Sequence, residues 1–201
     1  MLKIVIATKN AGKISEIQSI INNSDLKNMV ETETLLSYPD IPEIVEDGNT
    51  FSENASKKAL TVARFTGHIA VADDSGLEVD ALGGAPGVYS ARFSGEGATD
   101  PDNIKKLLEL LKDTPSGKRG ARFVCVIAIA TPSGDVRLAE GDCAGFIAEE
   151  GRGTSGFGYD PVFVVTEYGK TFAELGTEIK NKISHRAVAL GRISNILEKI
   201  I

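Results

Sequence analysis

Apolar residues along this chain alternate between compact runs typical of strands and periodic stripes typical of helices. Residues 2–7 form a partly β-branched apolar run, which predicts a buried strand. After a polar loop, four isoleucines at helical spacing predict a helix: Ile14, Ile17, Ile20 and Ile21. Residues 22–49 are mostly irregular and polar, with a short strand expected near residues 30–36.

The next segment predicts a capped helix followed by a strand. Thr50 and Glu53 have the spacing of a capping box, and Gly67 is suited to end the helix that follows. Residues 69–72 predict a short strand that runs into the acidic segment 73–76. We expect that segment to be a tight polar turn, because Asp, Ser and Gly favour turns.

The second half of the chain combines another helix with an antiparallel region. Asp100 can cap a helix whose first turn carries Pro101. Residues 123–130 and 136–140 predict two strands joined by a turn, and residues 143–150 are expected to extend this region.

The end of the chain predicts a glycine-rich loop, a strand and a helix. The loop spans residues 151–161, the strand spans 162–165, and Ser184 can cap the last helix. Its apolar stripe comprises Val188, Ile193, Ile196, Leu197 and Ile200. Mixed strands and helices without a repeat or a linker predict one domain over residues 1–201, with an α/β fold and a mixed sheet.

Composition narrows the possible classes of function. The 201 residues include 22 Lys and Arg against 28 Asp and Glu, so the net charge of −6 argues against coating a nucleic acid. Cys125 and Cys143 are isolated in apolar stretches and are expected to be small core residues. No apolar run approaches the roughly 20 residues that a membrane helix needs, and no signal peptide is evident, so we expect a cytoplasmic protein.

The loop before the first predicted helix is a candidate phosphate site. A helix N-terminus presents unpaired N–H groups and a partial positive charge, which favour an anion. An ordinary strand-to-helix turn with a surface lysine explains the segment about equally well, and the pattern is not a Walker loop. The segment consists of Thr8, Lys9, Asn10, Ala11, Gly12 and Lys13.

Asp73 and Asp74 form a candidate metal and water site. Adjacent carboxylates repel each other unless a cation lies nearby, and Mg²⁺ prefers such hard oxygen ligands. Because neighbouring side chains of an extended strand point to opposite sides, one aspartate is expected to bind metal or water while the other is structural. The alternative is a turn in which both side chains cap backbone N–H groups.

The segment Gly156–Pro161 contains two of the chain's few aromatic residues. Phe157 and Tyr159, flanked by Gly158, can open a slot for a flat base, and Asp160 can accept a hydrogen bond from a ring N–H. The alternative, that both rings plug the core, is normally the commoner outcome.

The last candidate segment is Ser184-His185-Arg186. Two cationic side chains at a helix N-terminus are unfavourable, and an acceptor-rich ligand would relieve this. Further polar residues that could support a site, although each alone is most often a solvated surface residue, are Glu16, Asn54, Lys58 and Lys180.

Together these segments resemble the inosine triphosphate pyrophosphatase family. The resemblance rests on TKNAGKISE, ADDSGLEVDALGGAPGVYSARFSG, GFGYDP and SHRAVAL, which follow the family's order and cover nearly the whole chain. It implies an elongated mixed sheet flanked by helices, two lobes around a central substrate cleft, Mg²⁺ dependence and a homodimer. It also implies hydrolysis of dITP, ITP and XTP to the nucleoside monophosphate and pyrophosphate.

The resemblance also assigns roles to residues. Asp74 is implied as the general base and a metal ligand, Ser75 as a substrate contact, and Glu46 as the second metal ligand. The loop of residues 8–13 is implied to bind phosphate. Lys58 is expected at the same phosphate end from the combined pattern of the residues. The implied base and sugar contacts are Phe157, Gly158, Tyr159, Asp160, Lys180, His185 and Arg186. Two alternatives stay open: a pyrophosphatase for pyrimidine or modified nucleotides, and a nucleotide sensor without turnover.

Overall fold

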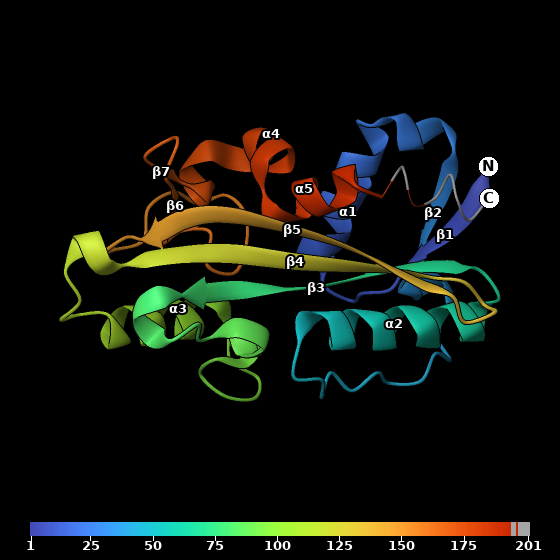
Figure 1. Ribbon diagram of the computed structural model, residues 1–201, viewed down its shortest axis with the longest axis horizontal. Coiled ribbons are helices and arrows are strands. Elements are labelled where there is room, and N and C mark those ends of the chain that lie inside the picture. Colours follow the sequence, from blue (N-terminus) through green and yellow to red (C-terminus); the bar gives the residue numbers. More distant parts are fainter. Residues whose placement is uncertain (194–195, 197–201) are drawn as a thin grey trace. The chain divides into compact units, whose positions relative to one another are not determined.

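Strand β1, Leu2–Ile6, lies between two parallel strands of a seven-stranded sheet (Figure 1). The computed structural model describes residues 1–193 and residue 196. The strand order is β2-β1-β3-β4-β5-β6-β7, and β5–β6 and β6–β7 are antiparallel pairs. The other strands are β2 (Val30–Thr34), β3 (Ile69–Val79), β4 (Gly120–Ala130), β5 (Val136–Ile147), β6 (Phe163–Val165) and β7 (Lys170–Thr171). The mixed sheet of the predicted α/β fold is therefore present.

The α-helices are α1 (Ala11–Asn22), α2 (Phe51–Thr66), α3 (Asp100–Leu110), α4 (Phe172–Ile183) and α5 (His185–Gly191). Helices α1, α2 and α3 lie between strands in the sequence, and α4 and α5 follow the last strand. Short 3₁₀ helices are η1 (Asp25–Asn28), η2 (Leu35–Ser37), η3 (Asp80–Leu82), η4 (Gly87–Arg92) and η5 (Ser116–Lys118). Among the described residues, no helix has both the length and the apolar character needed to cross a membrane.

The chain divides into two compact units. Unit 1 consists of Met1–Asp74, Cys125–Gly141 and Arg186–Ile201. Unit 2 consists of Ser75–Val124 and Asp142–His185. The expectation that the whole chain forms one domain with a central cleft stays a prediction.

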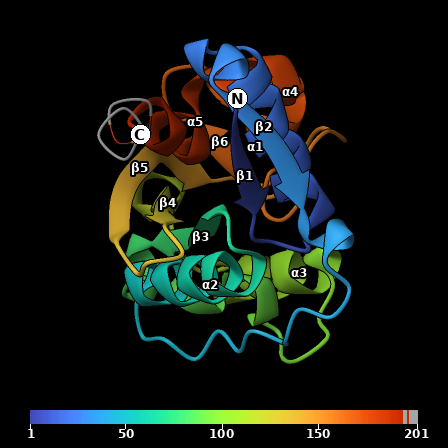
Figure 2. The same ribbon diagram turned by 90° about the vertical axis from the view of Figure 1, so that its right-hand side faces the viewer.

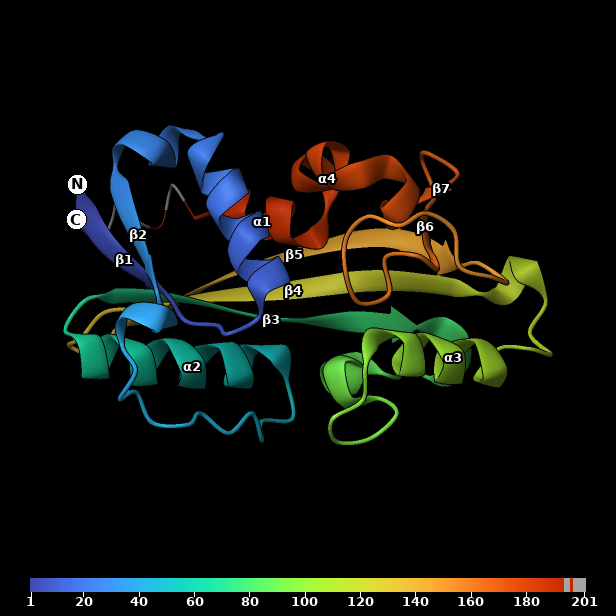
Figure 3. The ribbon, with the colours of Figure 1, turned by 180° about the vertical axis from the view of Figure 1, so that it is seen from behind.

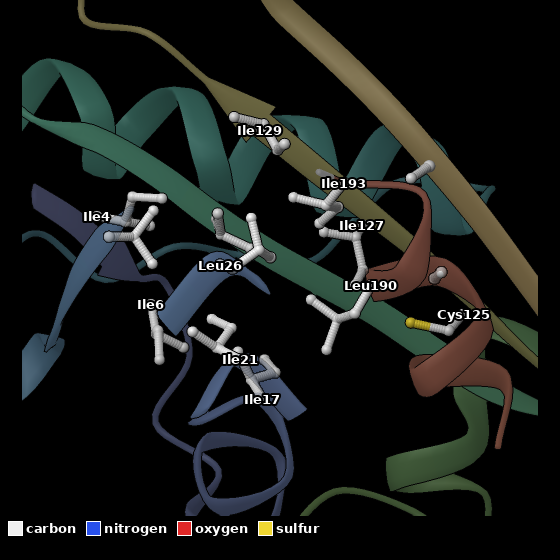
Figure 4. Close-up of a cluster of buried hydrophobic side chains, with 14 residues drawn as sticks. Ile4, Ile6, Ile17, Ile21, Leu26, Cys125, Ile127, Ile129, Leu190 and Ile193 are labelled. Carbon is white, nitrogen blue, oxygen red and sulfur yellow. The ribbon is translucent and has the colours of Figure 1, made fainter. Parts of the chain in front are cut away.

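Unit 1 is a three-layer arrangement around its part of the sheet. Helix α2 lies on one side of the strands, and α1 and α5 lie on the other (Figure 2). Figure 4 shows the apolar cluster on the α1 and α5 side, where Ile17 and Ile21 of α1 and Leu190 of α5 gather with Ile127 of β4. The isoleucine stripe of α1 therefore packs as its helical spacing predicts. Cys125 belongs to the same cluster, as expected of a small core residue.

Unit 2 has an aromatic core between α3 and α4, which lie on opposite sides of its strands (Figure 3). The ring of Phe163 lies 4.7 Å from that of Phe123 and 5.3 Å from that of Phe172, measured between centroids. Leu107 and Leu111 close the core from the α3 side.

The N-caps of α2 and α3 agree only in part with those predicted from the sequence. The hydroxyl of Thr50 caps α2 as expected, but the carboxylate of Glu53 accepts from the N–H of Asn49, so the reciprocal capping bond is missing. Helix α3 is capped by Thr99 and not by Asp100, which becomes its first residue; Thr99 and Asp102 form a full capping box. The prediction was one residue late because Asp and Thr are both good N-caps.

One further prediction about the C-terminal part needs correction. Helix α4 was missed, although Thr171 and Glu174 have capping-box spacing and form that box in the structure. Its break at Gly176, with φ of 76°, weakens the helical pattern. Helix α5 spans His185–Gly191, and the last two residues of the predicted apolar stripe, Leu197 and Ile200, lie outside the described residues.

The acidic segment of residues 73–76 is the most consequential correction. It is not a turn, because β3 continues through it to Val79. Asp73 and Asp74 therefore lie in the interior of a strand, where they are 0% and 6% exposed. Asp, Ser and Gly favour turns, but the pairing of β3 with its neighbouring strands keeps these residues extended.

Candidate active site

The loop before α1 is built by its own polar side chains. Asn10 is the N-cap, and its Oδ1 accepts from the N–H of Lys13 at 3.0 Å. The hydroxyl of Thr8 accepts from the N–H of Asn10 at 3.2 Å. Lys9 is exposed, and Ala11 and Gly12 open the helix, where N–H groups have no intrahelical acceptor. The predicted strand–loop–helix phosphate site thus has the required helix N-terminus.

Asp73 is the centre of a buried ion-pair network on the α1 and α5 side of unit 1. Its Oδ2 lies 3.2 Å from the Lys13 ammonium and accepts from Arg186 Nη2 at 2.8 Å. Arg186 also pairs with the carboxylate of Glu16, which projects from α1 one turn after Lys13. Burial would raise the pKa of Asp73, but Lys13 and Arg186 outweigh it and hold that pKa well below its usual range.

Asp74 meets different partners, supplied by α2 and the loop before it. Its Oδ2 accepts from Asn54 Nδ2 at 3.1 Å, and its Oδ1 lies 3.7 Å from the Lys58 ammonium. Lys58 in turn donates to Glu46 Oε2 at 2.8 Å. Burial raises the pKa of Asp74 even though Lys58 opposes the shift. A carboxyl whose proton affinity is increased in this way is a candidate base.

Glu46 and Asp74 also provide a donor set that suits a divalent cation. Both carboxylates lie beside the Lys58 ammonium, at 2.8 Å for Glu46 and 3.7 Å for Asp74. This ammonium balances part of their negative charge when no metal ion is bound. Among the described residues, no three His, Cys, Asp or Glu side chains cluster closely enough to hold a metal by themselves. Mg²⁺ characteristically uses one or two carboxylates and completes its shell with phosphate oxygens and water, so the residues fit it.

Arg186 does not act as the exposed fork that the sequence suggested. It is 1% exposed, and its Nε and Nη2 donate to Asp73 while Nη1 donates to Glu16. Its guanidinium therefore binds carboxylates inside unit 1, and its role as a base or phosphate contact stays a prediction. The physical reason is charge balance, because a buried guanidinium is stable only with carboxylate partners.

Three residues that, taken alone, are most often solvated surface residues are buried members of this cluster. Glu16 and Lys58 are each 5% exposed, and Asn54 is 1% exposed. A signal was available for each: Glu16 directly precedes Ile17 at the edge of the apolar stripe, and Asn54 and Lys58 directly precede Ala55 and Ala59 on the packed face of α2. We call the assembled set the carboxylate cluster; it comprises Lys13, Glu16, Glu46, Asn54, Lys58, Asp73, Asp74 and Arg186.

Unit 2 contains the second candidate segment, which we call the aromatic loop (residues 151–161). Asp160, 1% exposed, accepts from the Lys180 ammonium at 2.5 Å and from the N–H of Phe157 at 3.0 Å. Lys180 lies 4.5 Å from the centroid of the half-buried Phe157 ring. Phe157, Asp160 and Lys180 thus lie together, and Asp160 binds protein groups where a ring N–H was expected. Their role as base contacts stays a prediction.

Tyr159 and His185 pack in the interior of unit 2. Tyr159 is 4% exposed, and its hydroxyl donates to the carbonyl of Ser90 at 2.8 Å. It therefore follows the alternative in which the ring plugs the core, and it does not form one wall of a base slot. His185, 3% exposed, stacks on Phe123 with ring centroids 4.7 Å apart. Ser75 is half-buried on β3 as the first residue of unit 2.

Comparison with known protein families assigns nearly the whole chain to one family. A model of the Ham1 family matches residues 4–196. The chain belongs to the Ham1 family. This membership confirms the resemblance drawn from the four sequence segments.

Individual Ham1 relatives cover nearly the full length. The dITP/XTP pyrophosphatase of Desulforamulus reducens is 52% identical over 199 residues, which are 99% of this chain and 97% of that protein. The dITP/XTP pyrophosphatase of Geobacillus kaustophilus is 50% identical over 201 residues, 100% of this chain and 97% of that protein.

Solved Ham1 structures share the fold. A HAM1 protein from Coxiella burnetii has 41% identity and a TM-score of 0.87, with 99% of this chain and 100% of that chain covered. The Staphylococcus aureus Ham1 protein has 40% identity and a TM-score of 0.85 at the same coverage. The predicted α/β fold with a mixed sheet is therefore confirmed.

Proposed function

We propose that this protein hydrolyses non-standard purine nucleoside triphosphates (dITP, ITP and XTP) to the monophosphate and pyrophosphate. Family membership and the names of its relatives support this reaction. The observation that carries the proposal is the environment of Asp74. It is a buried carboxylate with a raised pKa, oriented by Asn54 and placed beside the cation Lys58.

Asp74 is the proposed general base. Asn54 holds its Oδ2, which leaves Oδ1 on the Lys58 side to accept a proton from the attacking water. Lys58 and Lys13 carry the positive charge that stabilises the departing pyrophosphate, together with the N-terminus of α1.

We propose Mg²⁺ as the cofactor, held by Glu46 and Asp74 and by oxygens of the substrate. When bound, Mg²⁺ supplies Lewis-acid chemistry that makes a water more acidic and neutralises phosphate charge. Lys58, which contacts both carboxylates, keeps their charges balanced before the substrate arrives.

The aromatic loop is proposed to bind the base, with Phe157 as the stacking surface. Hypoxanthine and xanthine present an O6 acceptor and an N1–H donor, whereas adenine presents the reverse. A site with matching polar groups leaves them unpaired against adenine, which gives strong discrimination. The small-molecule nucleotide is the proposed partner, in a cytoplasmic homodimer that binds neither nucleic acid nor membrane.

A substrate panel tests the proposal. ITP, dITP, XTP, GTP and dTTP are compared with Mg²⁺ present, and the released product is identified as pyrophosphate or orthophosphate. We expect pyrophosphate and the highest kcat/KM with ITP, dITP and XTP. Faster turnover of dTTP would favour the pyrimidine alternative, and binding without product would favour a sensor.

A further inference from the structure

The tip of the aromatic loop is held by two carboxylates that lie on different segments. The N–H of Phe157 donates to Asp160 of the loop itself, at 3.0 Å. The next N–H, that of Gly158, donates to Asp100 Oδ2 at 2.7 Å. Asp100 is 58 residues away in sequence, in the first turn of α3. The second bond therefore joins the loop to a helix.

Asp100 is well placed to act as a support. Helix α3 is anchored in the core of unit 2 by Leu107, which is 0% exposed. Its N-terminus is closed by the capping box of Thr99 and Asp102, so the Asp100 carboxylate is not one of the groups that form the cap. Asp100 itself is exposed, and its bond to Gly158 lies at the surface.

The loop depends on such tethers because it contains no helix or strand. Its ends are joined by the N–H of Arg152, which donates to the carbonyl of Pro161 at 2.8 Å. Between these residues, Gly153, Gly156 and Gly158 have positive φ values of 81°, 83° and 59°. Glycine adopts positive and negative φ about equally well, so these residues do not by themselves fix one loop conformation. Backbone hydrogen bonds also hold the loop, from the N–H of Asp160 to the carbonyl of Phe157 at 3.3 Å and from the N–H of Ser155 to the carbonyl of Ala173 at 3.4 Å. The bond from Gly158 to Asp100 adds a side-chain tether from α3 next to Phe157.

We propose that Asp100 is a positioning residue that latches the aromatic loop to α3 and so holds Phe157 in its substrate-binding position. A carboxylate accepting from a backbone N–H forms a charge-assisted hydrogen bond, which is stronger than a neutral one. The proposal rests on the proposed function, because it assigns the effect of the latch to nucleotide binding. Asp100 acts on KM through the loop and leaves the chemical step at Asp74 unchanged.

Three variants test the latch. Asp100→Ala removes the acceptor, Asp100→Asn keeps an acceptor oxygen without the charge, and Asp102→Asn removes the same charge from the same turn of α3 without touching the loop. We expect KM for ITP to rise about fivefold in Asp100→Ala and about twofold in Asp100→Asn, with kcat unchanged. Asp102→Asn is expected to lower Tm and leave KM unchanged.

Hydrogen exchange provides a readout that does not depend on activity. Peptides covering residues 155–162 are expected to exchange faster in Asp100→Ala than in the wild type or in Asp102→Asn. An unchanged KM in Asp100→Ala, an equal rise in Asp102→Asn, or unchanged exchange would each overturn the latch. If the wild-type protein does not hydrolyse ITP, the proposed function fails, while the exchange comparison still decides whether Asp100 holds the loop.

Discussion

Asp73 and Asp74 are consecutive residues of one strand with opposite environments. Asp73 is paired with Lys13 and Arg186 on the side of α1 and α5, and its pKa is held low by those two cations in spite of burial. Asp74 faces Asn54 and Lys58 of α2, and burial raises its pKa. The strand pleat separates two identical side chains into a structural anchor and a candidate base.

The largest expected effect is on the Asp74 side. Asp74→Asn keeps the shape and the contact with Asn54 but removes the proton acceptor, so we expect kcat to fall about a thousandfold. Nucleotide binding should be retained. Pyrophosphate release and equilibrium binding of ITP measure the two effects, and a near wild-type kcat would show that Asp74 is not the base.

On the opposite side we expect a loss of stability. Asp73→Asn leaves the buried Arg186 with one remaining carboxylate, Glu16, and removes the partner of the half-buried Lys13. It should lower the free energy of unfolding by about 3 kcal/mol at pH 7. Urea unfolding measures this loss, with Asp74→Asn as the matched variant. Equal stability of the two variants would contradict the division between anchor and base.

The pH dependence of that loss has a defined sign. Because the folded-state pKa of Asp73 is lowered, its stabilisation is present above about pH 4 and is lost as the pH falls further. The difference in unfolding free energy between the wild type and Asp73→Asn should therefore narrow between pH 4 and pH 2. A constant difference over this range would show that the stability loss does not come from the ionised carboxylate of Asp73.

Glu16 on the Asp73 side and Glu46 on the Asp74 side allow the same comparison with smaller expected effects. Glu16→Gln weakens a buried pair with Arg186 and should cost about 1.5 kcal/mol of stability. Glu46 is 39% exposed, so Glu46→Gln should change stability by less than about 0.5 kcal/mol while weakening activation by Mg²⁺. Thermal unfolding and Mg²⁺ titration of the rate separate the two. Similar stability losses would remove the distinction between the sides.

The smallest expected effect is the change in unfolding free energy caused by ionising Asp74. Its folded-state pKa is raised, so ionising it as the pH rises from about 4 costs stability in the folded protein. We expect Asp74→Asn to gain stability relative to the wild type between pH 4 and pH 7. A relative loss over that range would show that Asp74 ionises more easily in the folded state than burial allows.

Sequence by itself determined the local framework of this protein. The isoleucine spacing of α1, the Thr50 cap and Gly67 end of α2, and the apolar run of β1 follow from short-range periodicity and capping chemistry. The motif order also determined the family and the list of candidate residues, because motifs preserve residue types at set spacings.

Only the tertiary structure decided which partner each candidate meets. Arg186 lies 113 residues from Asp73 and 170 from Glu16, so no local pattern could pair them. Burial made these pairings necessary, since a charge removed from water is stable only beside its opposite. The same long-range packing extended β3 through the acidic segment and gave two adjacent aspartates different chemistry.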